Sequence, residues 1–181
     1  MGARERRPRP VTPPLQARHL MVTVPKRLGP DACLSHVRAE FDNDHVHLVL
    51  VVDRAGRLVT AIERADLGPG LDAASPASGY GRLEGRTVTS TTPLLAITRL
   101  LGSTGRRLAV VDDRGHLVGL VCLKRSRRGF CDDDGVRARA QERGRPVPAP
   151  LPRELTPLSP EEWREALMST VEDGARESQM P

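Results

Sequence analysis

The side chains that could carry out chemistry are spread along the chain and do not form a recognisable catalytic set. The cysteines Cys33, Cys122 and Cys131 lack Cys-x-x-Cys spacing, so we expect neither a zinc site nor a disulfide framework. His45 and His47 are two positions apart, like neighbouring side chains on one face of a strand, but two ligands do not complete a metal site. The sequence also lacks a Gly-rich phosphate loop and a Gly-x-Ser-x-Gly elbow. We therefore predict no catalytic residues, no metal and no required cofactor.

Charge is a second candidate source of function. The formal net charge is +5, and 28 residues are Lys or Arg, of which only Lys26 and Lys124 are lysine. The basic run Lys124–Arg128 could favour phosphate, although such a run is usually a solvated strand end. The arginines form no single stripe, so we do not expect nucleic-acid binding, which remains a second alternative. The acidic run Asp132–Asp134 is explained by the N-terminus of a helix.

The elements that must position these side chains occur twice. The run Val51–Val59 is repeated as Val110–Val118. The Asp of the second run lies 59 positions after the Asp of the first, and the Gly of the second run lies 59 positions after the Gly of the first. Aliphatic runs on either side of Asp and Gly predict two strands joined by a tight turn. Apolar residues at helical spacing predict a helix before each pair of strands, over Ala32–Asp42 and from Pro93 onward, capped by Asp31 and Thr92 respectively.

Further short elements complete the pattern. Strand-like pieces precede the helices at Met21–Val24 and Thr87–Thr89, and a helical turn is expected at Glu63–Leu67. Asp132 is expected to cap a helix that ends at Arg143. The predicted organisation is a disordered tail (1–19), a first repeat (20–68), a linker (69–85), a second repeat with its following helix (86–144), a Pro-rich linker (145–158), and a C-terminal helix and tail (159–181).

No membrane or secretory segment is evident. The longest purely aliphatic run, Leu48–Val52, is far too short to span a bilayer, and the Arg- and Pro-rich N-terminus has no apolar stretch. Free cysteines suit a reducing compartment. We therefore expect a cytoplasmic location.

The two repeats resemble the CBS (cystathionine-β-synthase-type) domain pair, or Bateman module. The motifs that carry the resemblance are LVLVVDRAGRLVTAIERADL in the first copy and RLAVVDDRGHLVGLVCLKR in the second. The resemblance covers residues 20–130 and implies an α/β (α+β) fold of tandem β-α-β-β-α repeats packed about a pseudo-two-fold. To this the sequence adds a flexible N-terminal tail and a Pro-linked C-terminal helix.

The resemblance also implies where ligands would bind. Asp66 stands at the family's ribose-binding Asp, whereas Arg125 replaces it in the second copy and Cys122 replaces a hydroxyl residue. A carboxylate suits a ribose diol because it accepts two hydrogen bonds. We thus expect at most one ribose-binding site. The first predicted site comprises Ile62, Glu63, Arg64, Asp66, Thr23, Val24, His47 and Leu48, and the degenerate second site comprises Thr87, Val88, Arg107, Leu108, Cys122, Lys124 and Arg125.

The resemblance implies a non-catalytic, homodimeric regulator that senses an adenosine compound (AMP, ADP, ATP or S-adenosylmethionine) and relays the signal to a partner. One alternative is an interaction module with decayed ligand sites, because Glu63 and Arg125 both depart from the motif. In that case the helix Pro160–Val171, which carries Trp163, could dock a protein partner.

Overall fold

The computed structural model describes residues 14–151. The elements below belong to the unit Gln16–Pro157. Residues 1–13 of the predicted disordered tail and the predicted C-terminal helix lie outside the described residues. The end of that tail is corrected, because residues 17–19 are helical and Ala17 is buried. The first repeat consists of β2 (Arg27–Leu28), α2 (Leu34–Phe41), β3 (Val49–Val52), β4 (Leu58–Ile62) and the 3-10 turn η1 (Arg64–Asp66). The second consists of β5 (Thr87–Thr89), α3 (Leu94–Thr104), β6 (Arg107–Val111), β7 (Leu117–Cys122) and α4 (Asp133–Glu142). Around them lie α1 (Ala17–Leu20), β1 (Met21–Val22) and the 3-10 turn η2 (Ala77–Gly79).

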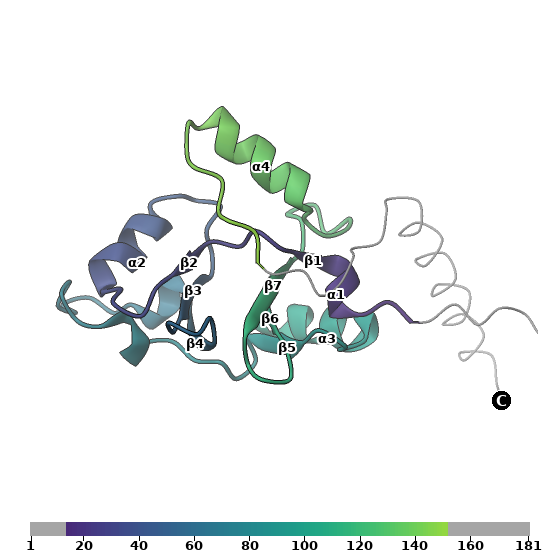
Figure 1. Cartoon of the computed structure of the whole chain (residues 1–181), viewed down its shortest axis with the longest axis horizontal. Helices are drawn as coiled ribbons and strands as arrows, with labels where there is room; N and C mark the ends of the chain where they lie inside the picture. Colours follow the sequence, from purple (N-terminus) through teal and green to yellow (C-terminus); the bar gives the residue numbers. More distant parts are fainter. Residues whose placement is uncertain (1–13, 152–181) are drawn as a thin grey trace, which may run out of the picture. The chain divides into compact units, whose positions relative to one another are not determined.

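The strands form two sheets (Figure 1), one per repeat, and the order of strands is β2-β3-β4 in one and β1-β7-β6-β5 in the other. In each sheet a short entry strand runs parallel to the first strand of the hairpin: Arg27 pairs with Leu50 in the first and Thr87 with Ala109 in the second. The expected entry strand at Met21–Val24 is therefore corrected. Residues Met21–Val22 do form a strand, but it pairs antiparallel with β7 of the other repeat.

The predicted turn chemistry is confirmed in both hairpins. Asp53 accepts hydrogen bonds from the backbone N–H groups of Ala55 and Arg57, at 2.9 and 2.8 Å. Asp112 does the same two and four residues on. Gly56 and Gly115 have φ of 84° and 81°, which side-chain-bearing residues rarely adopt. The two turns also exchange backbone hydrogen bonds, both of 3.0 Å, from Leu58 to Gly115 and from Leu117 to Gly56.

The two repeats share an aliphatic core, as the scarcity of aromatic residues requires. A single cluster joins residues of β3 and β4 with residues of β6 and β7. Because strands from both repeats bury their side chains together, the spatial relation of the repeats is fixed by packing as well as by the linker. The cluster contains Leu48, Leu50, Val52, Leu58, Ala61, Ala109, Leu117 and Leu151.

The structure corrects two predicted helix caps. Helix α2 begins at Leu34 with Cys33 as N-cap, and Asp31 is exposed, 3.9 Å from Arg54. The linker explains the difference, since the carbonyls of Ser75 and Ala73 accept the first N–H groups of the helix.

In the second copy Pro93, not Thr92, is the N-cap of α3. The Thr92 hydroxyl accepts instead from the Thr89 N–H, at 3.1 Å. The Asp132 cap is confirmed, because its side chain accepts from the N–H of Gly135 at 2.7 Å.

The Pro-rich segment after α4 folds back onto the first repeat (Figure 1, yellow-green). Leu151 donates its N–H to the Thr23 carbonyl at 2.8 Å, and Arg27 donates to the Ala149 carbonyl at 3.0 Å. Over residues 145–151 the segment is thus a strap along the entry to the first repeat. We call residues 145–151 the strap.

Candidate functional site

The pairing of β1 with the second repeat brings residues of both predicted sites together. Because β1 pairs with β7, the residues that follow β1 lie beside the end of the second repeat. A cleft of about 650 Å³, here called the basic cleft, consequently draws from both predicted sets. From the first set it takes Val24, His47 and Leu48, and from the second Arg107, Cys122, Lys124 and Arg125.

The wall of the basic cleft combines an apolar surface with many cations. Eight lysine and arginine side chains line it against one aspartate, Asp44. Apolar atoms come from β1, β7, α4 and the strap, including Val22, Leu120 and Val136. An adenine-sized apolar ring with an anionic tail matches such a surface. The cationic side chains are Lys26, Arg106, Arg107, Lys124, Arg125, Arg139, Arg143 and Arg145.

Few of these cations are neutralised by an acid within the described residues. Lys26 pairs with Glu40 at 2.6 Å, and Lys124 lies 3.4 Å from Asp132. Arg107 donates instead to the neutral carbonyl of His45, at 2.9 Å. The electrostatic consequence is visible at His47, whose pKa is lowered by burial and then by nearby cations, Arg107 first among them. The cleft thus penalises a further positive charge and favours an anion.

The predicted ribose anchor lies outside the lining of the basic cleft. Both carboxylate oxygens of Asp66 are occupied by Arg86, one of them at 3.0 Å, and the other also accepts the N–H of Glu63 at 2.8 Å. Arg86 also donates to Glu63 at 2.9 Å and to the Ala61 carbonyl at 2.8 Å, and only 4% of its side chain is exposed. A ribose at Asp66 would have to displace this guanidinium.

The electrostatics of Asp66 reflect that pairing. Burial raises the pKa of its carboxyl, but the hydrogen bonds from Arg86 and from the Glu63 backbone outweigh burial and hold it below the usual value. Within residues 14–151, neither Arg86 Nε nor the buried hydroxyl of Thr87 has a hydrogen-bond partner. We call the group Asp66, Glu63 and Arg86 the compensated site.

The remaining predicted site residues have structural contacts. Arg64 donates to the Phe41 carbonyl and places its guanidinium 4.9 Å from that ring. Ile62 and Leu108 are fully buried, and Val88 is buried in β5.

Thr23, predicted to line the adenine pocket, binds α4 instead. Its N–H and hydroxyl both donate to Asp133, at 2.7 and 2.6 Å. These two bonds attach α4 to the chain just after β1, so α4 is held beside the basic cleft.

His45 and His47 do not share a strand face, because β3 begins only at Val49. Within the described residues no group of three His, Cys, Asp or Glu side chains could hold a metal ion. In the same part of the chain, no helix has the length and apolarity to cross a membrane.

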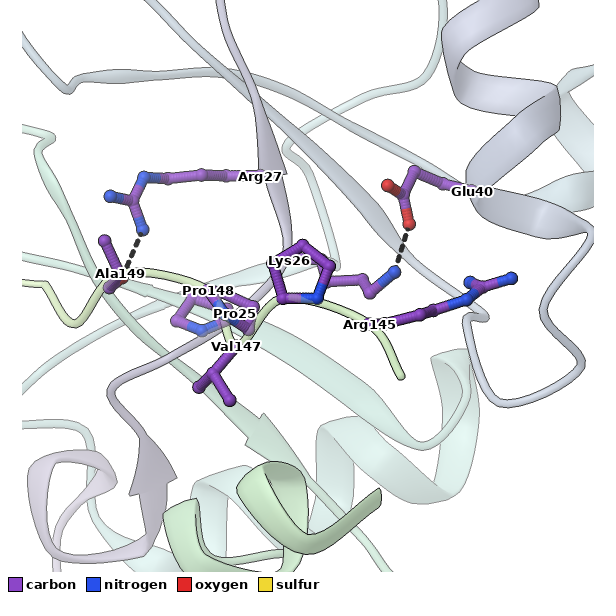
Figure 2. A pocket seen from close by; sticks show the side chains of 9 residues that line it. Pro25, Lys26, Arg27, Glu40, Arg145, Val147, Pro148 and Ala149 are labelled. Carbon is purple, nitrogen blue, oxygen red and sulfur yellow. Dashed lines mark hydrogen bonds and ion pairs between the residues drawn. The ribbon is translucent and has the colours of Figure 1, made fainter. Parts of the chain in front are cut away.

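A second, smaller cavity of about 440 Å³ lies against the strap (Figure 2). Figure 2 shows Arg27 bound to Ala149 and Lys26 bound to Glu40 on either side of Pro25. Lys26 and Arg145 line both this cavity and the basic cleft, so the strap forms a wall of each.

Sequence reasoning missed several residues of these sites. Arg86 directly precedes the entry strand β5, and the register of the two sheets makes Lys26 its counterpart before β2. A basic residue at both positions was the available signal. Arg139, Arg143 and Arg145 belong to α4 and the strap, whose placement over the cleft depends on tertiary contacts.

Comparison with known proteins identifies the fold. A family model for the CBS domain matches residues 86–125. The second repeat thus matches a CBS domain, and the two repeats together have the fold of a CBS domain pair. Among curated proteins, none matches its sequence.

Solved CBS structures resemble the chain at low sequence identity. A CBS domain pair/ACT domain protein from Thermotoga maritima is 18% identical, with a TM-score of 0.52 over 71% of this chain and 98% of that one. A CBS domain protein from Pyrobaculum aerophilum, solved with AMP, is 23% identical, with a TM-score of 0.50 over 62% and 95%. At these identities the likeness establishes the fold.

Two other similar structures are matched over only part of their length. The CBS pair domain of a protein described as a Mg2+ transporter of Shewanella oneidensis is 25% identical, with a TM-score of 0.48 over 58% of this chain. This chain spans 61% of that chain's length, and 44% of the cytosolic domain of a Mg2+ channel solved with ATP.

Proposed function

We propose that this CBS pair is a non-catalytic regulatory module that binds a phosphate-bearing adenosine ligand, of the AMP, ADP or ATP class, in the basic cleft. The observation that carries the proposal is the lining of that cleft, with eight cationic side chains against one carboxylate around an apolar surface. Its volume of about 650 Å³ is within the range of about 300–1,000 Å³ that is common for small-molecule sites.

The charge of the cleft discriminates within the adenosine class. Phosphates gain attraction from Lys124 and Arg125, and guanidinium groups can bind them through two parallel hydrogen bonds. S-adenosylmethionine carries a sulfonium and an ammonium group, and it brings positive charge into a cleft that already disfavours a charged His47. We therefore favour the nucleotides over S-adenosylmethionine.

Similar proteins agree with this assignment in part. The CBS protein from Pyrobaculum aerophilum was solved with AMP, which is consistent with an adenine nucleotide as ligand for this fold. For the compensated site we propose a structural role, because Arg86 already occupies the Asp66 carboxylate. The alternative of decayed ligand sites thus describes the compensated site, and we propose a ligand for the basic cleft alone.

The cleft also suggests how binding would be relayed. Its lining includes residues of both repeats, of α4 and of the strap, so one occupant would contact all four. Since α4 and the strap lead to the C-terminal segment, we propose that a bound nucleotide changes how that segment meets a protein partner. A cytoplasmic location and a homodimer remain part of this proposal.

The test is calorimetric titration of the full chain with ATP, ADP, AMP, adenosine and S-adenosylmethionine. We expect affinity to fall in the order ATP, ADP, AMP, with no measurable binding of adenosine. Arg125→Ala should weaken ATP binding about tenfold by removing a charge-assisted contact. Arg54→Ala is the matched control, because the Arg54 side chain is 86% exposed in the turn after β3. Equal affinity for adenosine and ATP would overturn the proposal.

A further inference from the structure

Two thiols face each other at the wall of the basic cleft. The Cys122 and Cys131 sulfurs are 2.9 Å apart, and both residues line the cleft. Cys122 ends β7, whereas Cys131 directly precedes Asp132, the cap of α4. The ligand-binding proposal makes no use of this pair.

The backbone holds the two cysteines opposite each other. Leu123 and Phe130 form an antiparallel bridge, and the Cys131 N–H donates to the Cys122 carbonyl at 2.7 Å. Directly opposed residues of an antiparallel pair have Cα atoms about 4.5–5.5 Å apart, which is within the range that a disulfide spans. A disulfide here therefore requires little movement of the backbone.

The surroundings favour reaction at Cys131. The hydrogen bond shared with Cys122 lowers the pKa of the Cys131 thiol, and the nearby cations Arg139 and Arg107 act in the same direction, against the opposing effect of burial. The same hydrogen bond, together with burial, raises the pKa of Cys122. Of the two groups, Cys131 is thus the one that more readily forms a thiolate and Cys122 the one that stays a thiol, which is the arrangement of an attacking and a resolving cysteine.

We propose that Cys122 and Cys131 are a redox modification site that forms a reversible disulfide when the protein meets a hydroperoxide. In the first step the Cys131 thiolate attacks the peroxide and the O–O bond breaks, which leaves a sulfenic acid on Cys131. The departing oxygen takes up one proton and is released as water or an alcohol. In the second step the Cys122 sulfur displaces hydroxide from the sulfenic sulfur, and the Cys122 proton leaves with it as water. Two thiols are oxidised and one peroxide is reduced.

Oxidation would change the basic cleft in two ways. It removes the negative charge of the Cys131 thiolate beside Arg107 and Arg139, and it ties the start of α4 to the end of β7. Both changes act at the wall where we place the nucleotide, and this consequence alone rests on the proposed function. The disulfide itself does not depend on any ligand.

The test uses the full chain, reduced, treated with EDTA and then exposed to increasing hydrogen peroxide. Mass spectrometry of peptides should find a 122–131 linkage, with the loss of two hydrogens, at lower peroxide than any modification of Cys33. Dithiothreitol should reverse it. Cys33 is the internal control. Its sulfur contacts the side chains of Ser35 and His36, whereas the sulfurs of Cys122 and Cys131 contact each other.

Variants locate the two steps. Cys122→Ser should trap a sulfenic acid on Cys131 that a dimedone probe labels, whereas Cys131→Ser should leave Cys122 reduced. Cys33→Ser should form the linkage as the wild type does. If wild-type Cys122 and Cys131 both remain free thiols while Cys33 is oxidised, the proposal is wrong. That result would leave the nucleotide proposal standing, since nucleotide binding in the basic cleft requires no disulfide.

Discussion

The two repeats place corresponding residues in two sites of opposite character. At the compensated site the positions are held by Asp66, Glu63 and Arg86, and the guanidinium of Arg86 binds both carboxylates. At the basic cleft the corresponding positions are held by Arg125, Cys122 and Lys26.

The difference fits the proposed division between a structural site and a ligand-binding site. The same backbone framework stabilises the chain at one site through an internal ion pair. At the other it leaves cations lining a cleft, available to a ligand.

The largest expected effect concerns stability at the compensated site. Arg86→Ala leaves Asp66 and Glu63 without their buried cation and should lower the free energy of unfolding by about 3 kcal/mol. The matched variant is Lys26→Ala, which removes a half-exposed pair with Glu40 and should cost less than about 1 kcal/mol. Urea denaturation measures both, and similar losses in the two variants would contradict the comparison.

Charge reversal at the basic cleft should act on binding. The double variant Lys124→Glu/Arg125→Glu should weaken ATP binding by about 30- to 100-fold, or about 2–2.7 kcal/mol, because attraction becomes repulsion. The variant Arg54→Glu/Arg114→Glu makes the same change of charge at the two hairpin turns and should bind ATP within about twofold of the wild type. Equal weakening by both variants would show a general charge effect and no site.

A smaller effect is expected where β1 crosses onto β7. A Cβ atom on Gly119 would lie 2.9 Å from the Val22 carbonyl oxygen, and the Met21 side chain would also obstruct it. Gly119→Ala should therefore cost about 1–2 kcal/mol of stability through overpacking. Val118→Thr, one position away on the partly exposed face, is the control and should cost less than about 1 kcal/mol. A neutral Gly119→Ala would indicate that β1 does not pack there.

The smallest effect is the acid dependence of the compensated site. Since the folded pKa of Asp66 is depressed, its stabilisation is complete above its unfolded pKa of about 3.9 and is lost as pH falls through the lower folded value. The stability advantage of wild type over Asp66→Asn should therefore shrink as pH is lowered below about 4. Denaturation at a series of pH values measures it, and an advantage that grows toward acid would refute the pairing.

Local patterns predicted much of this fold from the sequence. The repeated strands, the Asp-Gly turns and the Asp132 cap each depend on a few neighbouring residues, and each is confirmed. The caps predicted at Asp31 and Thr92 are wrong. At the start of α2, carbonyls of the distant linker accept the first N–H groups of the helix. Before α3, the Thr92 hydroxyl accepts from the Thr89 N–H instead.

The composition of the sites was harder to predict. It depends on the pairing of β1 with β7, on the ion pair of Arg86 with Asp66 and on the packing of the strap. All three join residues that are far apart in the sequence. The family resemblance placed Asp66 together with His47, whereas the structure puts only His47 in the basic cleft.

A crystal structure of the full chain with ADP would distinguish the two sites most directly. We expect the phosphates to lie beside Lys124 and Arg125 in the basic cleft, with Arg86 still bound to Asp66. A nucleotide whose ribose binds Asp66, with Arg86 displaced, would contradict this expectation.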